Sequence, residues 1–437
     1  MAKNANHKVG VWQSLRNAWK VEDIRKKLIY TFLMLLLYRL VGMIPVSGIN
    51  AEVVAEMANT YDMLGLINMM TGSAFSQMTV MAMGISPYIN ASIIMQLLTV
   101  ALPSLERLQK EGGEEGKKKI QRITRYVTIG LAALQAIGII GGLNQSGNVL
   151  QAEYSNFFGY VTIGIIMAGG TALAMWIGER ITKNGIGNGI SLLIFAGIIS
   201  NMFNGILIAF TDVIGVTNYG ATIWQFLAIL ITALVITALV TFVDMGERRI
   251  PVQYAKRVVN RRVYGGQNTH IPMKVISVGV LPLIFAYSFL SFPGTIFAFF
   301  GTNSGVYQWW NNNMSQTSPL YMIILAVLII AFAYFYTSIT FNPREIAENI
   351  QRQGGNIRGI RPGKNTIDYL VRTSNRLTLF AGLFLAVLAT VPTLLSVWQN
   401  VQIPFAASSV LIAVSVALES VRQVEAQLVM RHYKGFL

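Results

Sequence analysis

Apolar residues occur in long runs along the chain, and short polar segments separate one run from the next. Most runs approach the ~20 residues that an α-helix needs to cross the hydrocarbon core of a bilayer. The pattern therefore predicts an all-α polytopic membrane protein with about ten transmembrane helices. The predicted spans are residues 28–45, 78–102, 123–143, 158–178, 190–210, 221–243, 275–300, 319–341, 376–398 and 404–421.

Lys and Arg occur in alternate links between these spans, and Arg39 inside the first span is the one exception. Because cytoplasmic links are enriched in Lys and Arg, the alternation predicts that both termini are cytoplasmic. The links that carry Lys or Arg are 103–125, 179–189, 244–274 and 342–376. The links that carry neither are 46–77, 144–157, 211–220, 301–318 and 399–403.

The second span contains the break Gly84-Ile85-Ser86-Pro87. Proline removes a backbone donor and clashes with the preceding turn, so we expect a kinked helix over 78–102. The apolar run Met63 to Met70 just before it is too short to cross a bilayer and predicts a segment folded into the membrane protein. The alternative is a kink that serves helix packing alone.

The same break returns in the second half of the chain. Five spans precede the link 211–220 and five follow it, so the second half is inserted upside down relative to the first. Its second span carries Gly279-Val280-Leu281-Pro282. Paired interrupted helices in inverted repeats point to a central pathway, although a four-residue pattern also recurs by chance. The predicted parts are an N-terminal half at 1–210, an external hinge at 211–220 and a C-terminal half at 221–437.

Composition narrows what such a pathway carries. The chain is 53% hydrophobic and 12% charged, with a net charge of +15 and no cysteine. The usual charged share is ~25%. Carboxylates are nearly absent from the spans, which argues against an ion-coupled transporter. The alternative is an ion site built from backbone carbonyls. An apolar constriction that stays dry suits a large, chemically variable cargo. No catalytic set, metal site or cofactor motif is recognised, so the sequence predicts a protein that is not an enzyme.

The links 244–274 and 342–376 are long, basic and rich in turn-forming residues, and Arg361 lies between Gly359 and Pro362. Long loops in compact proteins are often functional, and the arginine fork suits carboxylate or phosphate. We therefore expect docking of an acidic protein surface or of ribosomal RNA. The alternative is that these charges only fix the topology.

Five short stretches, in this order, resemble the SecY family, the pore subunits of the bacterial protein-conducting channel, and the resemblance covers essentially the whole chain. The stretches are Gly84 to Ile94, Gly185 to Ser191, Tyr254 to Arg257, Phe341 to Glu345 and Gly359 to Gly363. The resemblance implies two inverted five-helix halves, with a re-entrant plug helix near 63–72. It further implies a passive conduit for unfolded polypeptides and for lateral insertion of transmembrane helices. Two positions depart from the family, Val410 where Leu is frequent and Asn90 where Ser is frequent.

The resemblance also implies roles for individual residues. The matching pore-ring positions are Ile85, Ile89, Ile190, Ile194, Ile284 and Ile412. The matching plug positions are Leu64, Leu66, Ile67, Met70, Gly72 and Ser73. The matching lateral-gate positions are Pro87, Asn90, Gln96, Pro282 and Phe292. The matching positions for docking SecA or the ribosome are Lys256, Arg257, Arg261, Arg262, Arg361 and Lys364.

The partners implied by the resemblance are SecE and SecG in a heterotrimer, the ATPase SecA, the ribosome, signal peptides, nascent chains and membrane lipids. The implied location is the bacterial cell membrane. Two other classes compete with this interpretation. A secondary transporter for a small solute would share the inverted repeat, and a membrane-embedded enzyme acting on lipid would need a carboxylate or His cluster near a membrane face.

Overall fold

The computed structural model divides the chain into two compact units, which are described separately. Unit 1 comprises residues 1–226, 288–321 and 412–437, and unit 2 comprises 227–287 and 322–411. The structure describes residues 16, 19–60, 68, 71–213, 223–254, 257–259, 262–264, 268–276, 279, 281–298, 304–315, 318–399 and 407–434.

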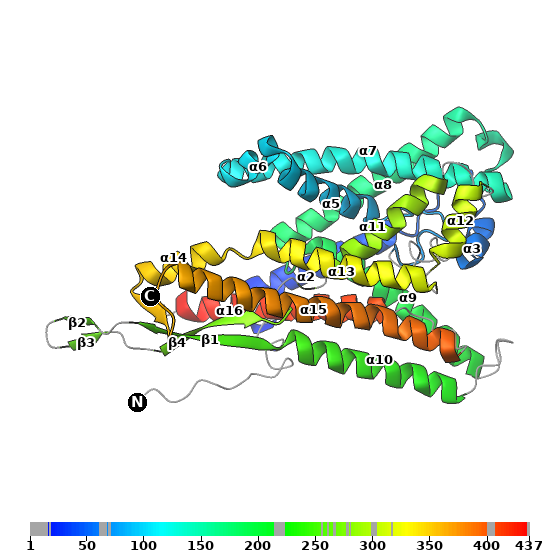
Figure 1. Ribbon diagram of the computed structural model, residues 1–437. Coiled ribbons are helices and arrows are strands. Elements are labelled where there is room, and N and C mark those ends of the chain that lie inside the picture. Colours follow the sequence, from blue (N-terminus) through cyan, green and yellow to red (C-terminus); the bar gives the residue numbers. More distant parts are fainter. Residues whose placement is uncertain are drawn as a thin grey trace. The chain divides into compact units, whose positions relative to one another are not determined.

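Unit 1 is built mainly from the first half of the chain (Figure 1). Its complete elements are α2 (Glu22–Val41), α3 (Ala51–Thr60), α5 (Ser86–Ala101), α6 (Pro103–Lys110), α7 (Gly113–Gly147), η1 (Ala152–Tyr154), α8 (Phe157–Asn184), α9 (Gly189–Val213) and α12 (Gly305–Asn313). Four further helices contribute residues to both units, namely α10 (Ile223–Asp244), α11 (Leu281–Ala298), α13 (Pro319–Thr340) and α16 (Ala407–Lys434).

Helix α8 lies at the centre of unit 1 and packs against α2, α7 and α9. Small residues let these helices approach closely, as is usual between membrane-spanning helices. A Cβ atom added to Gly164 would lie 2.5 Å from Cγ1 of Ile137 on α7. A Cβ atom added to Gly170 would lie 1.9 Å from the carbonyl oxygen of Val80. Glycine is therefore required at both positions by the close packing of neighbouring backbone and side chains.

The prediction of a kinked helix over 78–102 is wrong in one respect, because residues 78–85 form turns and α5 begins only at Ser86. In a membrane interior, backbone that is not helical must find hydrogen-bond partners within the protein. This segment finds them in the chain after α2. The amide of Val46 donates to the carbonyl of Met78 at 2.9 Å, and the amide of Val80 donates to the carbonyl of Ile44 at 2.9 Å.

Unit 2 contains a small sheet at one end of its helices (Figure 1). Its remaining elements are β1 (Glu247–Tyr254), β2 (Arg257–Val259), β3 (Arg262–Tyr264), β4 (Asn268–Lys274), α14 (Pro343–Arg352), β5 (Gly355–Ile357) and α15 (Lys364–Gln399). Strand β1 pairs antiparallel with β4 and with β5, and β2 pairs with β3 in a separate hairpin. The two basic links are thus joined, since β1 belongs to one and β5 to the other.

A hydrophobic core lies between the sheet and the helices around it. Ile250 and Val252 of β1 point into this core, where they meet Ile350 of α14 and Leu370 of α15. The expectation of purely turn-rich links is therefore incomplete. The alternation of Ile250, Val252 and Tyr254 with Arg249, Pro251 and Gln253 is the strand signal that the sequence interpretation missed.

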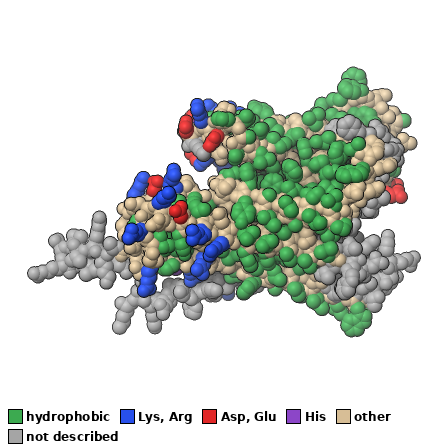
Figure 2. All heavy atoms as spheres, in the orientation of Figure 1, with side chains coloured by type: hydrophobic (Ala, Val, Ile, Leu, Met, Phe, Trp, Pro, Cys, Tyr) green, Lys and Arg blue, Asp and Glu red, His purple; other side chains and the backbone are tan. Residues whose placement is uncertain are grey.

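Each of the ten predicted spans overlaps a helix, which confirms the predicted predominance of helices. Five helices among the described residues are long and apolar enough to cross a membrane, or six if the bent pair α5 and α6 forms one span. The bend between those two helices is 102°. Figure 2 shows hydrophobic side chains along the helices of each unit, and Lys and Arg near α6 in unit 1 and near α14 in unit 2.

Candidate functional site

Two helices begin in the same way, one in each half of the sequence. Gly84 has φ +53° and Gly279 has φ +64°, a left-handed conformation that favours glycine. The Gly84 amide donates to the carbonyl of Met81, and the Gly279 amide donates to the carbonyl of Ile276, three residues earlier in both cases. Pro87 and Pro282 then occupy the second residue of α5 and α11. The recurring pattern therefore marks helix starts, where proline is well tolerated, and not kinks within helices.

The predicted ring isoleucines lie at or near these two helix starts and on two other helices, α9 and α16. Ile89 and Ile284 each lie five residues after the glycine, and both side chains are buried, as is Ile85. Ile194 on α9 and Ile412 on α16 are buried as well. Their shared role as a ring stays a prediction.

Ile190 differs from the other predicted ring positions because it is only partly buried. It is the second residue of α9. A Cβ atom added to Gly178 on α8 would lie 3.1 Å from its Cγ1 atom, so part of this side chain packs within unit 1.

The predicted gate residues lie on α5 and α11. Pro87 and Asn90 are buried on α5, and Gln96 one to two turns later donates from its amide to the hydroxyl of Ser92 at 3.3 Å. Pro282 is buried at the start of α11, whereas Phe292 near its other end is partly buried. Asn90 is a buried polar side chain, and such groups are retained for specific hydrogen bonds or for function.

Most of the predicted plug lies outside the described residues, namely Leu64, Leu66, Ile67 and Met70. The described part shows how the plug segment ends. Gly72 has φ +68°, and the amide of Ser73 donates to the carbonyl of Asn68 at 3.0 Å. A left-handed glycine with a hydrogen bond spanning five residues is the Schellman motif that ends helices. Ser73 itself has φ +69°, which is uncommon for a residue that is not glycine.

Polar side chains from two distant helices reach this plug end. The hydroxyl of Ser73 donates to Oδ1 of Asn201 on α9 at 2.6 Å. The Nδ2 group of Asn201 donates to the carbonyl of Asn68 at 3.0 Å. The guanidinium of Arg39 on α2 donates to the carbonyls of Gly72 at 3.2 Å and Ala196 at 3.1 Å. In the sequence, Arg39 stands out only as the exceptional charge within a span, and no pattern marks Asn68 or Asn201.

The predicted docking residues lie in the part of unit 2 that holds the sheet, or outside the described residues. Lys256 and Arg261 lie outside the described residues, while Arg257 is the first residue of β2 and Arg262 is the first residue of β3. Arg361 and Lys364 are both exposed.

Arg361 sits in a turn between two left-handed glycines, Gly359 at φ +81° and Gly363 at φ +97°. Its carbonyl accepts a hydrogen bond from the hydroxyl of Thr366 at 3.1 Å, which ties the turn to the first residues of α15. The side chain thus extends from a braced turn into solvent.

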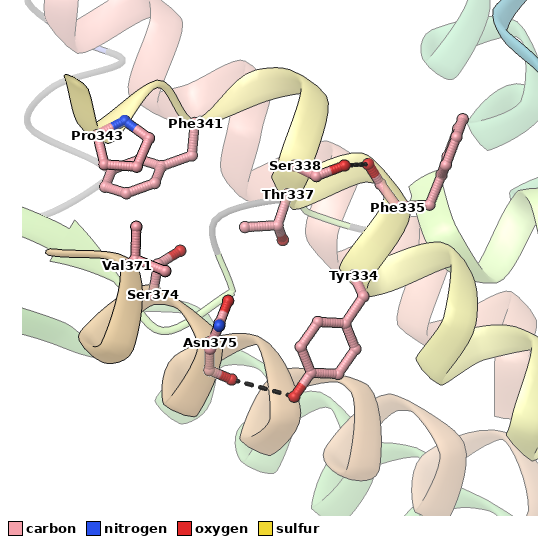
Figure 3. A pocket seen from close by; sticks show the side chains of 9 residues that line it. All are labelled: Tyr334, Phe335, Thr337, Ser338, Phe341, Pro343, Val371, Ser374 and Asn375. Carbon is pink, nitrogen blue, oxygen red and sulfur yellow. Dashed lines mark hydrogen bonds between the residues drawn. The ribbon is translucent and has the colours of Figure 1, made fainter. Parts of the chain in front are cut away.

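A cavity of about 530 Å³ lies in unit 2 between α13 and α15 (Figure 3). None of the predicted site residues lines it. Two of its hydroxyl groups are already occupied, because Tyr334 donates to the carbonyl of Asn375 and Ser338 donates to the carbonyl of Phe335. The lining residues are Tyr334, Phe335, Thr337, Ser338, Phe341, Pro343, Val371, Ser374 and Asn375. Elsewhere, the described residues hold no group of three or more His, Cys, Asp or Glu that could bind a metal ion.

Comparisons with known proteins cover nearly the whole chain. The SecY family profile matches residues 79–421. The protein translocase subunit SecY of Streptomyces galbus is 41% identical over 440 residues, which cover 96% of this chain and 98% of that relative. A solved structure described as "The structure of a protein conducting channel" has a TM-score of 0.68 at 21% identity, covering 92% of each chain. "Sec61 in the Canine ribosome-channel complex from the endoplasmic reticulum" has a TM-score of 0.63 at 20% identity, with 92% of each chain covered.

Proposed function

The chain belongs to the SecY family and is the protein-conducting channel subunit of the Sec translocon, and on this premise we propose that its two matching helix starts line the path of the translocated polypeptide. Ile89 and Ile284 occupy equivalent positions after these starts. Together with Ile85, Ile190, Ile194 and Ile412 they form an apolar ring that excludes water and ions when no polypeptide is present. A narrow apolar constriction gates by dewetting and needs no specific filter.

The observation that carries this proposal is the repeated geometry of Gly84–Pro87 and Gly279–Pro282. In both, a left-handed glycine, a turn hydrogen bond and an early proline start a helix whose buried isoleucine lies five residues after the glycine. Broken segments in corresponding positions of two inverted halves are typical of a central transport pathway. The gate residues Pro87, Asn90, Gln96, Pro282 and Phe292 lie on the same two helices. These residues form the lateral gate. This gate is the seam through which signal sequences and nascent transmembrane helices reach lipid.

The segment that ends at Gly72 and Ser73 is the plug that closes the channel from outside. Its described end is held by a Schellman motif and by side chains of α2 and α9. The left-handed glycine Gly72 is the point about which we propose that the plug moves. Displacement of the plug, opening of the seam and pushing by a partner then admit the polypeptide.

The partners follow from the channel function and the exposed basic residues of unit 2. We assign docking of SecA and of the ribosome to the sheet, α14 and the turn at Arg361, with Lys364 beside it and Lys256, Arg257, Arg261 and Arg262 in the β2–β3 region. Association with SecE and SecG, a bacterial cell-membrane location and cytoplasmic termini complete the proposal. Exposed arginines on a braced turn suit carboxylate or phosphate groups of a partner.

Reconstitution of the channel complex with SecE, SecA, ATP and a signal-bearing precursor tests the proposed function. The precursor should become protected from protease inside the vesicles only when ATP and the motor are present. A variant with Ile284→Asn should leak ions in the absence of precursor. Saturable uptake of a small solute without motor or ribosome would instead favour a secondary transporter.

A separate substitution tests the docking role of Arg361. Arg361→Glu should reduce motor-driven export at least tenfold while the complex still assembles, because the charge reversal repels the carboxylates that a fork would bind. Arg358→Glu is the matched control, since Arg358 is also exposed and lies three residues away. Equal losses in both variants would mean that the net charge of the loop matters and that Arg361 has no particular role.

A further inference from the structure

Two polar side chains from outside the plug segment, Asn201 and Arg39, contact its last described residues. Asn201 of α9 accepts a hydrogen bond from the Ser73 hydroxyl and donates one to the Asn68 carbonyl, so both ends of its amide are used. The Asn68 carbonyl also accepts from the Ser73 amide at 3.0 Å and from the Thr71 hydroxyl at 3.2 Å. One carbonyl thus receives three donors, two from the plug segment and one from α9.

Arg39 adds a charge to the same place. Its guanidinium bridges the Gly72 carbonyl at the plug end and the Ala196 carbonyl in α9, one nitrogen to each. Among the described residues no carboxylate forms an ion pair with it. An arginine within a span is expensive and generally marks a functional position, and backbone carbonyls are frequent partners of such residues. Arg39 lies near the C-terminal end of α2, only two residues before that helix ends at Val41.

We propose that Arg39 and Asn201 are a latch that holds the plug end against α9 in the resting channel and that releases when the plug moves. This inference rests on the proposed plug function of the segment. It assigns positioning roles to two residues on helices that lie far from the plug in the sequence. The latch joins the first span, the plug end and the fifth span of the predicted series, so plug movement must break contacts to both helices.

The conformation of Ser73 contributes to the contact between the plug end and α9. At φ +69° the backbone of Ser73 is strained, since a left-handed conformation is unfavourable for residues with a Cβ atom. The Ser73 hydroxyl bond to Asn201 is short at 2.6 Å and offsets that strain only while the plug end is docked. The strained turn places the Ser73 hydroxyl on Asn201, so the contact with α9 depends on that turn being kept.

Packing offers a competing explanation, in which these hydrogen bonds only satisfy polar groups during folding. The two explanations predict different effects of substitution, one on assembly of the protein and the other on opening of the channel. A structural role predicts loss of assembled protein when Asn201 is removed. A latch predicts normal assembly and a channel that opens more readily when no polypeptide is present.

Resting ion conductance of the full channel complex in planar bilayers tests the latch. Asn201→Ala removes at least two hydrogen bonds, so we expect the resting conductance to rise roughly tenfold. Arg39→Lys keeps the charge but loses the fork that reaches two carbonyls, and a rise of roughly threefold to tenfold is expected. Asn204→Ala is the control, because Asn204 is an exposed residue on the same helix and should leave conductance unchanged.

A double-mutant cycle sharpens the test. Ser73→Ala combined with Asn201→Ala should raise conductance no further than Asn201→Ala alone, since both changes remove the same hydrogen bond. Additive increases would overturn the claim that the two side chains act together.

Disulfide locking tests the latch in the opposite direction and requires a folded channel. The chain contains no cysteine, so Ser73→Cys with Asn201→Cys introduces a single pair. Oxidation should stop export, and a reductant should restore it. Undiminished export with the crosslink complete would overturn the proposal.

Deletion of residues 61–70 separates failure of the latch from failure of the plug assignment. If that deletion raises conductance while Asn201→Ala and Arg39→Lys do not, the plug stands and the latch is wrong. If the deletion also leaves conductance unchanged, the plug assignment itself is wrong.

Discussion

The helix starts at Gly84 and Gly279 have the same local backbone but very different surroundings. Both glycines are left-handed and both precede a proline at the second residue of a helix. A Cβ atom added to Gly84 would lie 2.8 Å from Cγ2 of Thr71, whereas one added to Gly279 would meet no described atom within 4 Å. The first start is thus packed against Thr71, at the end of the proposed plug, whereas the second has no described neighbour at the equivalent atom.

The comparison shows that the four-residue motif specifies the local backbone conformation, whereas the packing around it depends on the rest of the fold. Four residues are enough to end a turn and begin a helix, so the same start occurs twice. Among the described residues, Thr71 in the largely buried segment 71–85 adds a further contact at the first start. Thr71 is held there by its own hydroxyl, which donates to the Asn68 carbonyl and accepts from the Phe75 amide.

The largest expected effect comes from adding a methyl group at each glycine. Gly84→Ala should lower the stability of the purified complex by about 2–5 kcal/mol, because left-handed strain adds to a clash with Thr71. Gly279→Ala should lower it by only about 1–2 kcal/mol, since strain acts alone. Thermal unfolding in detergent measures both. Thr71→Ser removes the clashing methyl group and should recover part of the loss in Gly84→Ala. Equal losses at the two glycines would break the comparison.

A smaller effect, similar in the two halves of the chain, is expected on the resting ion leak when the isoleucine five residues after each glycine is replaced. Ile89→Asn and Ile284→Asn each place an amide in the proposed apolar constriction, which favours its wetting by about 1–3 kcal/mol. Resting ion leak should rise by a similar factor in both, and poor signal sequences should be exported better. Ile296→Asn on α11 is the control, because that side chain is 41% exposed. A leak from one isoleucine and not the other would mean that the two starts do not face the same pathway.

The smallest expected effect concerns the prolines. Pro87→Ala and Pro282→Ala should each change stability by less than about 1 kcal/mol, because proline at a helix start acts mainly on the unfolded chain. Urea titration of the detergent-solubilised complex measures the change. A loss near 3 kcal/mol at Pro87 alone would show that its ring has a structural role that Pro282 lacks.

The sheet of unit 2 could not be predicted from the lengths of the apolar runs. Links 244–274 and 342–376 were predicted as basic and turn-rich, which is correct for Gly359–Gly363 but misses β1, β4 and β5. Strand β5 has only three residues, and it forms because Val252 to Tyr254 of the other link supply its hydrogen-bond partners. Such pairing depends on residues about a hundred positions away and leaves little local signal.

The sequence by itself determined the features that depend on neighbouring residues. Run length specifies helices that suit a bilayer, and a glycine followed three residues later by proline specifies a break in a predicted span. The alternation of Lys and Arg between links predicts a topology in the same local way. Each of these features depends on the membrane environment or on the backbone of a few neighbouring residues. Each can therefore be recognised in the sequence without knowledge of the fold.

Only the tertiary structure decided that this break is a helix start, how backbone groups in residues 71–85 find partners, and which side chains bond to Asn68, Gly72 and Ser73. Those outcomes rest on hydrogen bonds between distant segments, such as Val80 with Ile44 and Arg39 with Ala196. A buried polar group must be paired, but its identity does not say with which residue. The partner is selected when the helices pack, and that choice is absent from any local pattern.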